Sequence, residues 1–157
     1  MIRTAVPADA PVLAALHRRA RATYYREGFP DEGDPGAWVE RWAVAIARPH
    51  GHVLVCVRDG VVVGLASFRR PDEAPADTAV LYQFQVDPDH WNRGIGTELH
   101  AACVEQWRVD DVAEVHLIVH GDNTRAQAFY ARHGWVDEGP EGSGSTHRRM
   151  RLTPGRE

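Results

Sequence analysis

The sequence contains no lysine, so all 18 of its basic residues are arginines. This absence excludes every mechanism that needs a lysine side chain, including a lysine Schiff base and the lysine of a phosphate-binding P-loop. An arginine-rich chain without lysine also suggests a bacterial source with a GC-rich genome.

Positive charge is in short supply as well. The chain has 22 acidic residues and a formal net charge of -4 at pH 7. Nucleic acids and anionic membrane surfaces are bound by clustered positive charge. We therefore expect neither nucleic acid nor membrane as a partner.

Long apolar runs are missing too. The longest strongly apolar stretch, residues 53–57, is far shorter than the roughly 20 residues that span a bilayer. The first ten residues lack the apolar segment of a signal peptide. These two absences predict a cytoplasmic protein.

Cysteine is scarce, and histidine follows no metal-binding pattern. The two cysteines, Cys56 and Cys103, lack the spacing of a metal or redox motif, and we expect both to be buried, reduced thiols. The nine histidines form no zinc-binding spacing. No metal is expected.

The order of apolar segments predicts one mixed α/β domain over residues 1–157. A short strand at residues 2–5 precedes two helices, one beginning after Asp9 and one carrying Trp38 and Trp42. Strands at 53–58 and 61–68 flank Asp59-Gly60, a strong hairpin signal. Then follow a strand at 80–86, a helix from 94 to about 109, a strand at 115–119, a helix at 123–133, and strands beginning at 135 and 147.

The segment Arg93-Gly94-Ile95-Gly96-Thr97 follows a predicted strand and opens a predicted helix. Its glycines let backbone amides approach a ligand closely, and the helix N-terminus attracts anionic oxygens. A diphosphate fits this chemistry. A tight turn that merely packs the helix against the sheet is the alternative.

A second motif, NxxAxxFYxxxGW, covers residues 123–135. Alone, it would describe a capped amphipathic helix with Phe129 and Tyr130 in the core. Both motifs in this order, after a strand ending at Val86, resemble the Gcn5-related N-acetyltransferase (GNAT) superfamily. The resemblance extends over nearly the whole chain and is strongest from Leu81 to Trp135.

The resemblance implies a fold: a mixed, mostly antiparallel sheet with a central splayed parallel strand pair, flanked by about four helices. The pair matches Leu81 to Val86 and Val115 to Val119. It also implies that acetyl-CoA is the acetyl donor, bound in the gap between these strands, and it makes a homodimer possible. The cofactor-binding residues it implies are Phe84, Gln85, Val86, Arg93, Gly94, Ile95, Gly96, Thr97, Asn123, Ala126, Phe129 and Tyr130.

The resemblance further implies that Tyr130 protonates the leaving thiolate. Two positions depart from the family pattern. Trp91 stands where the family usually has glutamine or arginine, and Val80 stands where lysine-acetylating members carry a glutamate base. His120 is our candidate for the missing base because a pKa near 6.5 suits proton transfer at neutral pH; an exposed histidine without a role is the alternative, and His116 is a weaker candidate.

The acceptor site is expected between the loop at residues 24–38 and the connection at 138–145. The first loop mixes aromatic and acidic residues that could receive a cationic amine, or it could be merely solvated. The expected substrate-binding residues are Tyr24, Phe29, Tyr82 and Gln83. We therefore predict that the protein is an N-acetyltransferase for a small-molecule or peptide amine, and that it acts by direct attack in a ternary complex. A sensor module without transferase activity, or a relative using another acyl group, is the alternative.

Overall fold

The computed structural model describes residues 1–24 and 34–155, which form one sheet with helices on both faces. The strands are β1 (Ile2–Thr4), β2 (Gly51–Arg58), β3 (Val61–Arg69), β4 (Thr78–Val86), β5 (Glu114–His120), β6 (Val136–Pro140) and β7 (His147–Leu152). The α-helices are α1 (Ala10–Ala22), α2 (Pro35–Ala47), α3 (Ile95–Val109) and α4 (Thr124–Arg132). The strand order is β1-β2-β3-β4-β5-β7-β6. Among the described strands only the β4–β5 pair is parallel, so the predicted fold class is confirmed.

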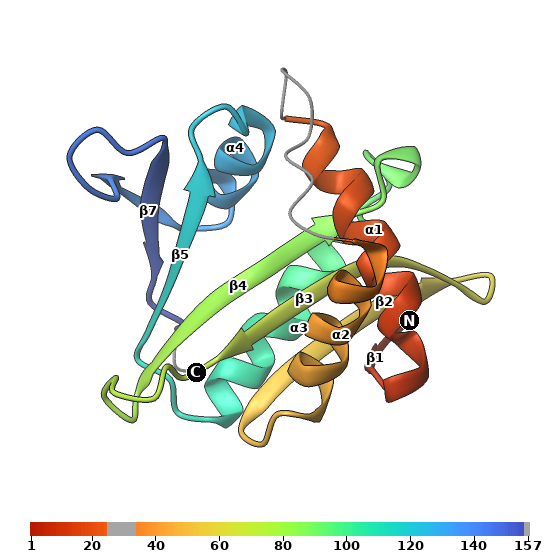
Figure 1. Ribbon diagram of the computed structural model, residues 1–157. Helices are drawn as coiled ribbons and strands as arrows, with labels where there is room; N and C mark the ends of the chain where they lie inside the picture. Colours follow the sequence, from red (N-terminus) through yellow and green to blue (C-terminus); the bar gives the residue numbers. More distant parts are fainter. Residues whose placement is uncertain (25–33, 156–157) are drawn as a thin grey trace.

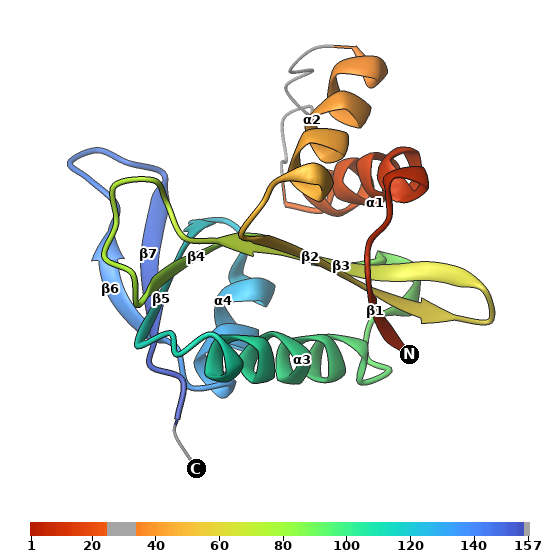
Figure 2. The same ribbon diagram turned by 90° about the horizontal axis from the view of Figure 1, so that it is seen from below.

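The sheet separates two helical layers. Helices α1 and α2 cover one face, and α3 and α4 cover the other (Figure 2). Each layer buries its own apolar cluster: Trp38 and Trp42 lie in the α1/α2 cluster, and Trp107 lies in the α3/α4 cluster. This division follows from the sequence, because a helix with one apolar stripe must press that stripe against a sheet face.

The turns and helix starts follow their local chemistry. Asp59 and Gly60 have φ angles of 52° and 76°, as a two-residue hairpin turn with positive φ at both positions requires. Asp34 caps α2 by accepting from the Ala37 amide at 2.9 Å. Asp9, by contrast, gives α1 no side-chain cap, because its carboxylate binds Arg3 at 2.8 Å.

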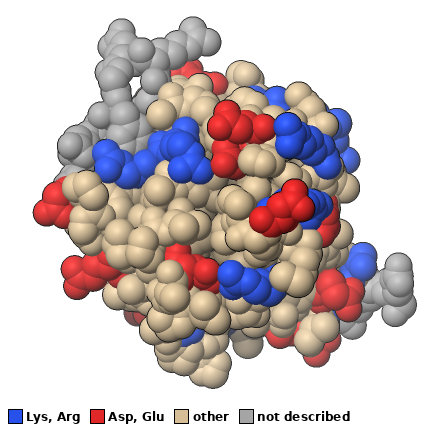
Figure 3. Space-filling view, turned by 90° about the vertical axis from the view of Figure 1, so that its right-hand side faces the viewer, with Lys and Arg blue, Asp and Glu red and all other residues tan. Residues whose placement is uncertain are grey.

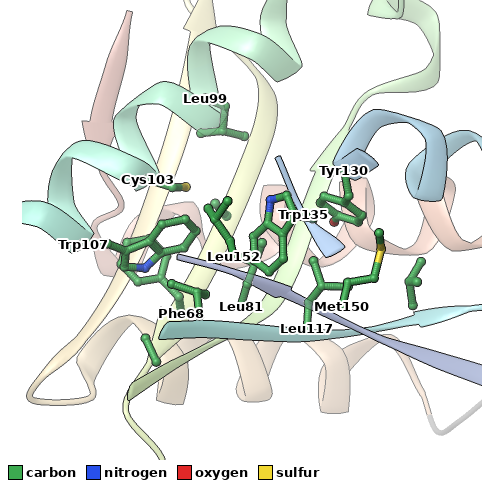
Figure 4. Packing of buried hydrophobic residues seen from close by; sticks show 14 of the residues in the cluster. Phe68, Leu81, Leu99, Cys103, Trp107, Leu117, Tyr130, Trp135, Met150 and Leu152 are labelled. Carbon is green, nitrogen blue, oxygen red and sulfur yellow. The ribbon is translucent and has the colours of Figure 1, made fainter. Parts of the chain in front are cut away.

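The two largest fully buried side chains, Trp107 and Phe68, belong to the α3/α4 cluster (Figure 4). Trp107 and Cys103 of α3 are fully buried, and Tyr130 of α4 packs beside Trp135 with ring centroids 5.6 Å apart. Cys56 is also fully buried, and neither cysteine is in a disulfide, so the expectation of buried thiols is confirmed.

The parallel pair separates along its length. Strands β4 and β5 pair only at three successive positions, ending with Val80 opposite His116. Beyond this point the two strands diverge (Figure 1). β5 stays paired with β7 from Val115 to His120, so the gap opens on the β4 side of β5.

An extra residue in β4 lies where the divergence begins. Ser67 of β3 pairs with Gln83, whereas the next residue, Phe68, pairs with Leu81, so Tyr82 has no partner across the ladder. Such a β-bulge bends and twists the strand that carries it. The bulge therefore turns the C-terminal half of β4 away from β5.

The described part of the surface carries no strong single-sign feature on the face in Figure 3, where acidic and basic side chains are interspersed. No described helix is long and apolar enough to cross a membrane. Among the same residues, no group of three or more histidine, cysteine or acidic side chains is arranged to hold a metal ion.

Two histidines are buried and have low pKa values. His100 is 5% exposed, and its Nε2 accepts from the Trp135 indole at 2.9 Å. Burial lowers the pKa of His100 to about 4, with a smaller contribution from His133. Burial, followed by the charges of Arg21 and Arg41, likewise lowers the pKa of His17 to about 4.

The buried histidines make stability depend on pH. Between about pH 4 and pH 6.5 these two histidines bind more protons in the unfolded chain than in the folded chain. The stabilisation that is fully present above pH 6.5 is therefore lost as the pH falls towards 4. Urea unfolding at about pH 7 and about pH 5 should show a loss of about 1–2 kcal/mol per histidine. His100→Gln keeps an acceptor for Trp135 and should lose that much less than the wild-type chain; an equal loss would contradict the burial argument.

Candidate active site

The gap between β4 and β5 is the mouth of a cleft of about 800 Å³. Its walls come from the end of α1, both diverging strands, the N-terminus of α3 and most of α4. Most of the residues predicted to contact a cofactor or substrate line it: Tyr24, Tyr82, Gln83, Phe84, Gln85, Val86, Gly94, Ile95, Gly96, Thr97, His120, Asn123, Ala126, Phe129 and Tyr130. Arg93 is absent from this lining, and Phe29 lies outside the described residues.

The divergence leaves backbone groups of β4 facing the cleft. The Asp87 amide donates to the Val63 carbonyl of β3 at 2.8 Å. Because alternate residues of a strand face the same neighbour, the backbone groups of Gln85 also face β3, and those of Phe84 and Val86 face the gap. The Val86 carbonyl accepts from the Trp91 indole at 3.1 Å. The amides of Phe84 and Val86 are therefore directed into the cleft.

The N-terminus of α3 ends in the same cleft without a side-chain cap. The first helical bond runs from Glu98 to the Gly94 carbonyl, which leaves the amides of Ile95, Gly96 and Thr97 without helical acceptors. Gly94 has a φ of 78°, a conformation that favours glycine, and a Cβ there would meet nothing within 4 Å. This end of α3 has the donors and the dipole orientation of an anion site.

Gly96 serves a different purpose from Gly94. A Cβ at Gly96 would lie 3.0 Å from the Phe129 ring of α4. Phe129 in turn stacks on His133 at 4.0 Å, and the His133 ring contacts the Thr97 hydroxyl at 3.3 Å. The second glycine thus allows α4 to pack directly against the first turn of α3.

Tyr130 lies in the cleft wall and is 6% exposed. Burial raises the pKa of its phenol above the ordinary value, and Cys103 and Tyr24 add smaller contributions in the same direction. Within residues 1–24 and 34–155 its hydroxyl makes no hydrogen bond. A protonated hydroxyl at this place can donate to a group in the cleft.

His120 lies at the end of β5, with its ring 5.6 Å from that of Tyr24 and 5.2 Å from that of His147. Its Nδ1 accepts from the Asp122 amide at 3.0 Å. The neutral ring then carries its proton on Nε2 and can donate there. His120 can accept a proton only at Nδ1, which already accepts from the Asp122 amide, so this hydrogen bond must break first. His116 contacts Glu114 and Glu138 instead and is not part of the cleft lining.

Two glutamines project from β4 beside each other. Gln85 Nε2 donates to Gln83 Oε1 at 2.9 Å. The other oxygen, Gln85 Oε1, is buried and has no partner among the described residues. Buried acceptors without a partner are costly, which makes Gln85 a place for a donor from a bound molecule.

A Trp91–Arg125 pair lies in the cleft wall near the N-terminus of α3, and the sequence motifs did not reveal it. The Arg125 guanidinium lies 3.8 Å from the centroid of the Trp91 ring and donates to Asn92 at 3.4 Å. Trp91 and Arg125 both line the cleft. Arg125 falls inside the second motif, but nothing in that motif shows a contact with a residue 33 positions earlier. Arg125 thus brings a positive charge to the cleft wall, of which Arg93 is not a part.

Two further predictions concern local structure. Asn123 caps α4, as expected, because its Oδ1 accepts from the Ala126 amide at 3.2 Å. Gly134 follows α4 with a φ of 93° and ends the helix, also as expected.

Comparison with known proteins relates most of the chain to acetyltransferases. Residues 13–135 match the acetyltransferase (GNAT) family. A protein of Sanguibacter keddieii named mycothiol acetyltransferase is 33% identical over 126 residues, covering 78% of this chain and 38% of the relative. One of the same name in Clavibacter sepedonicus is 34% identical over 129 residues, covering 82% and 40%. The chain thus spans about two fifths of the length of these curated relatives.

Solved structures show the same fold. A PaiA N-acetyltransferase from Thermoplasma acidophilum, in complex with coenzyme A, superposes with a TM-score of 0.81 at 20% identity, covering 98% of both chains. A ribosomal-protein-alanine N-acetyltransferase from Brucella melitensis gives 0.76 at 26% identity, covering 98% of this chain and 99% of that one.

The contact between Gly96 and Phe129 can be tested by adding one methyl group. Gly96→Ala should lower the free energy of unfolding by about 1–3 kcal/mol, because the ring or the helix must shift. Gly142→Ala is the matched control, since a Cβ there meets nothing within 4 Å. Equal stabilities of the two variants in urea unfolding would show that α4 does not need this close approach.

Proposed function

The chain belongs to the acetyltransferase (GNAT) family, and we propose that it transfers the acetyl group of acetyl-CoA to a primary amine by direct attack in a ternary complex. The observation that carries the proposal is the early end of the β4–β5 pairing, beside an uncapped helix N-terminus and a protonated tyrosine. These features supply a backbone edge, an anion site and an acid in one cleft.

The described residues fit coenzyme A as the carrier of the acetyl group. The amides of Ile95, Gly96 and Thr97 suit a diphosphate, and Arg125 adds a positive charge beside them. The amides of Phe84 and Val86 suit the amide groups of pantetheine and the thioester carbonyl. When bound, the carrier supplies a thioester that an amine can attack.

The transfer forms a carbon–nitrogen bond and breaks the carbon–sulfur bond of the thioester. A backbone amide of β4 stabilises the negative charge that develops on the carbonyl oxygen. The Tyr130 hydroxyl donates its proton to the departing sulfur, and the attacking nitrogen loses one proton. Much of the remaining rate comes from holding the two reactants together in the cleft.

The base for the amine proton depends on the acceptor. Val80 cannot accept a proton, and His120 can do so only after its bond from Asp122 breaks. An amine with a pKa near 7.7–8.0, the value for the α-amino group of a peptide, is far less basic than lysine at about 10.4, so enough of it is neutral to react without a strong base. We propose an acceptor with an amine of this kind, with His120 as the base where one is needed.

The names of the relatives support a small acceptor. Two curated relatives are named mycothiol acetyltransferase, whereas a structural neighbour is named for acetylating ribosomal-protein alanine. A small molecule is our first choice and a peptide N-terminus our second. A sensor without transferase activity would keep the coenzyme site but would not need the Tyr130 hydroxyl.

The first experiment is thermal unfolding with and without acetyl-CoA, followed by measurement of free thiol after adding a panel of amines. Ligand at 100 times its dissociation constant should stabilise the fold by ~2.7 kcal/mol. Stabilisation with amine-dependent thiol release would support the transferase. Stabilisation without thiol release for any amine would favour the sensor, and no stabilisation would contradict both.

Gly94→Asp should abolish coenzyme A binding, because it places a negative charge at the helix N-terminus that would hold the diphosphate. Gly60→Asp is the matched control: both glycines have positive φ and open space at the Cβ position, but Gly60 lies in the β2–β3 turn. Calorimetric titration with coenzyme A should show binding only to the control. Normal binding to folded Gly94→Asp would overturn the diphosphate site.

Tyr130→Phe should lower turnover by ~10²-fold or more, in the range for loss of a positioned acid. Coenzyme A affinity should change little, because the ring and its packing remain. Steady-state kinetics and titration of the same protein separate the two effects. Unchanged turnover would remove Tyr130 from the proton transfer.

A further inference from the structure

A second cavity, of about 300 Å³, lies on the α1/α2 face of the sheet. Its lining includes His17, Trp38 and Trp42 from the helices. Tyr82 and Gln83 line both this cavity and the cleft between β4 and β5. A molecule seated here can therefore reach toward the reacting end of the cleft past the bulge of β4.

The charged residues in the described lining of this cavity are all arginines. Four arginines line the cavity, namely Arg21, Arg41, Arg48 and Arg69. Among the described residues, no aspartate or glutamate lines it. The whole chain, in contrast, has more acidic than basic residues. The face in Figure 3 also mixes both signs. Four cations around one small cavity are thus a local feature.

Two of the arginines lie side by side. A Cβ built on Gly51 would lie 3.7 Å from the Cβ atoms of both Arg48 and Arg69. No described carboxylate forms a salt bridge with either guanidinium. Arg69 also lies over the Tyr82 ring at 4.9 Å, which places its charge beside the bulge.

The other two arginines lie at the helical side. The guanidinium carbons of Arg21 and Arg41 are 5.8 Å and 5.1 Å from the centroid of the Trp38 ring. Between them, His17 is held neutral, with a pKa lowered by burial and by both arginines. Among the described residues, its Nδ1 has no hydrogen-bond partner.

We propose that this cavity is the acceptor subsite and that it selects amines that also carry an oxyanion, a carboxylate or a phosphate. This inference rests on the proposed function and specifies its substrate class. Arg48 and Arg69 bind the oxyanion, while Trp38 and Trp42 contact the body of the molecule. The amine then lies at Gln83, where the cavity meets the cleft.

Arginine suits this task because its planar fork matches a carboxylate or a phosphate with two parallel hydrogen bonds. Gly51 keeps the space between the two stems free of a side chain. The expected acceptor differs from the cationic partner that the acidic loop sequence suggested. It is a small molecule with an amine at one end and a negative charge at the other.

The test compares two pairs of amines that differ only in the anion. Phenylalanine is compared with 2-phenylethylamine for the carboxylate, and phosphoethanolamine with ethanolamine for the phosphate. Calorimetric titrations are carried out on the full chain, with and without coenzyme A, so that binding is measured without turnover. At least one amine that carries the carboxylate or phosphate should bind at least tenfold more tightly than its partner without that group, and the stronger pair identifies the oxyanion.

Matched variants show whether the two arginines cause the preference for the anion. The double variant Arg48→Gln/Arg69→Gln should abolish the preference. Arg70→Gln, at a neighbouring arginine outside the cavity, should leave it intact. Gly51→Asp places a carboxylate between the two stems and should also abolish the preference, whereas Gly51→Asn, of equal size, should retain most of it. This second pair keeps the test decisive if the double variant fails to fold.

The outcomes separate the subsite from the proposed function. If neither anion is preferred, or if the preference survives in the double variant and in Gly51→Asp, the subsite is wrong, even when coenzyme A still binds. If the anions are preferred but coenzyme A does not bind, the oxyanion site stands and the transferase proposal fails.

Discussion

One extra residue in β4, Tyr82, determines which side chains of this strand face each side of the sheet. Before the bulge, Ala79 and Leu81 point into the cluster under α3 and α4. After it, Phe84 points there instead, and Gln83 lies on the α1/α2 face with His17 and the tryptophans. Without the extra residue, strict alternation would direct the glutamines into the apolar core. The bulge therefore both turns Gln83 toward the α1/α2 face and separates β4 from β5.

The separation creates a need that a ligand can meet. Backbone groups of β4 that lose their β5 partners must find others, because unpaired buried donors are costly. Trp91 satisfies the Val86 carbonyl, and the remaining groups face the cleft. The proposed coenzyme would bind the backbone groups of β4 that β5 leaves unpaired. This role would explain why the edge of β4 beyond Val80 stays open in an otherwise well-packed sheet.

Helices α3 and α4 are held together at the point where they would contact this ligand. Phe129 packs against Gly96 on one side and against His133 on the other, and His133 contacts Thr97. The same small group of residues thus fixes the N-terminus of α3 and the helix that carries Tyr130. These two parts of the cleft are consequently positioned by one packed unit, while the second cavity is lined by α1, α2 and strand residues on the other face of the sheet.

The sequence by itself determined the order of elements, the Asp59-Gly60 hairpin and the helix ends at Asn123 and Gly134, because these depend on local chemistry. Most of the residues that line the cleft were implied by the resemblance of its two motifs to a known family. The apolar residues Ala79, Leu81 and Phe84 also indicate the bulge, because the spacing between inward-facing residues changes from two to three at Tyr82. Only the tertiary structure decided which distant residues come together: Arg125 lies over Trp91, and Arg48 and Arg69 both lie beside Gly51. These residues belong to different segments of the chain, and no local pattern encodes how two segments come to lie side by side.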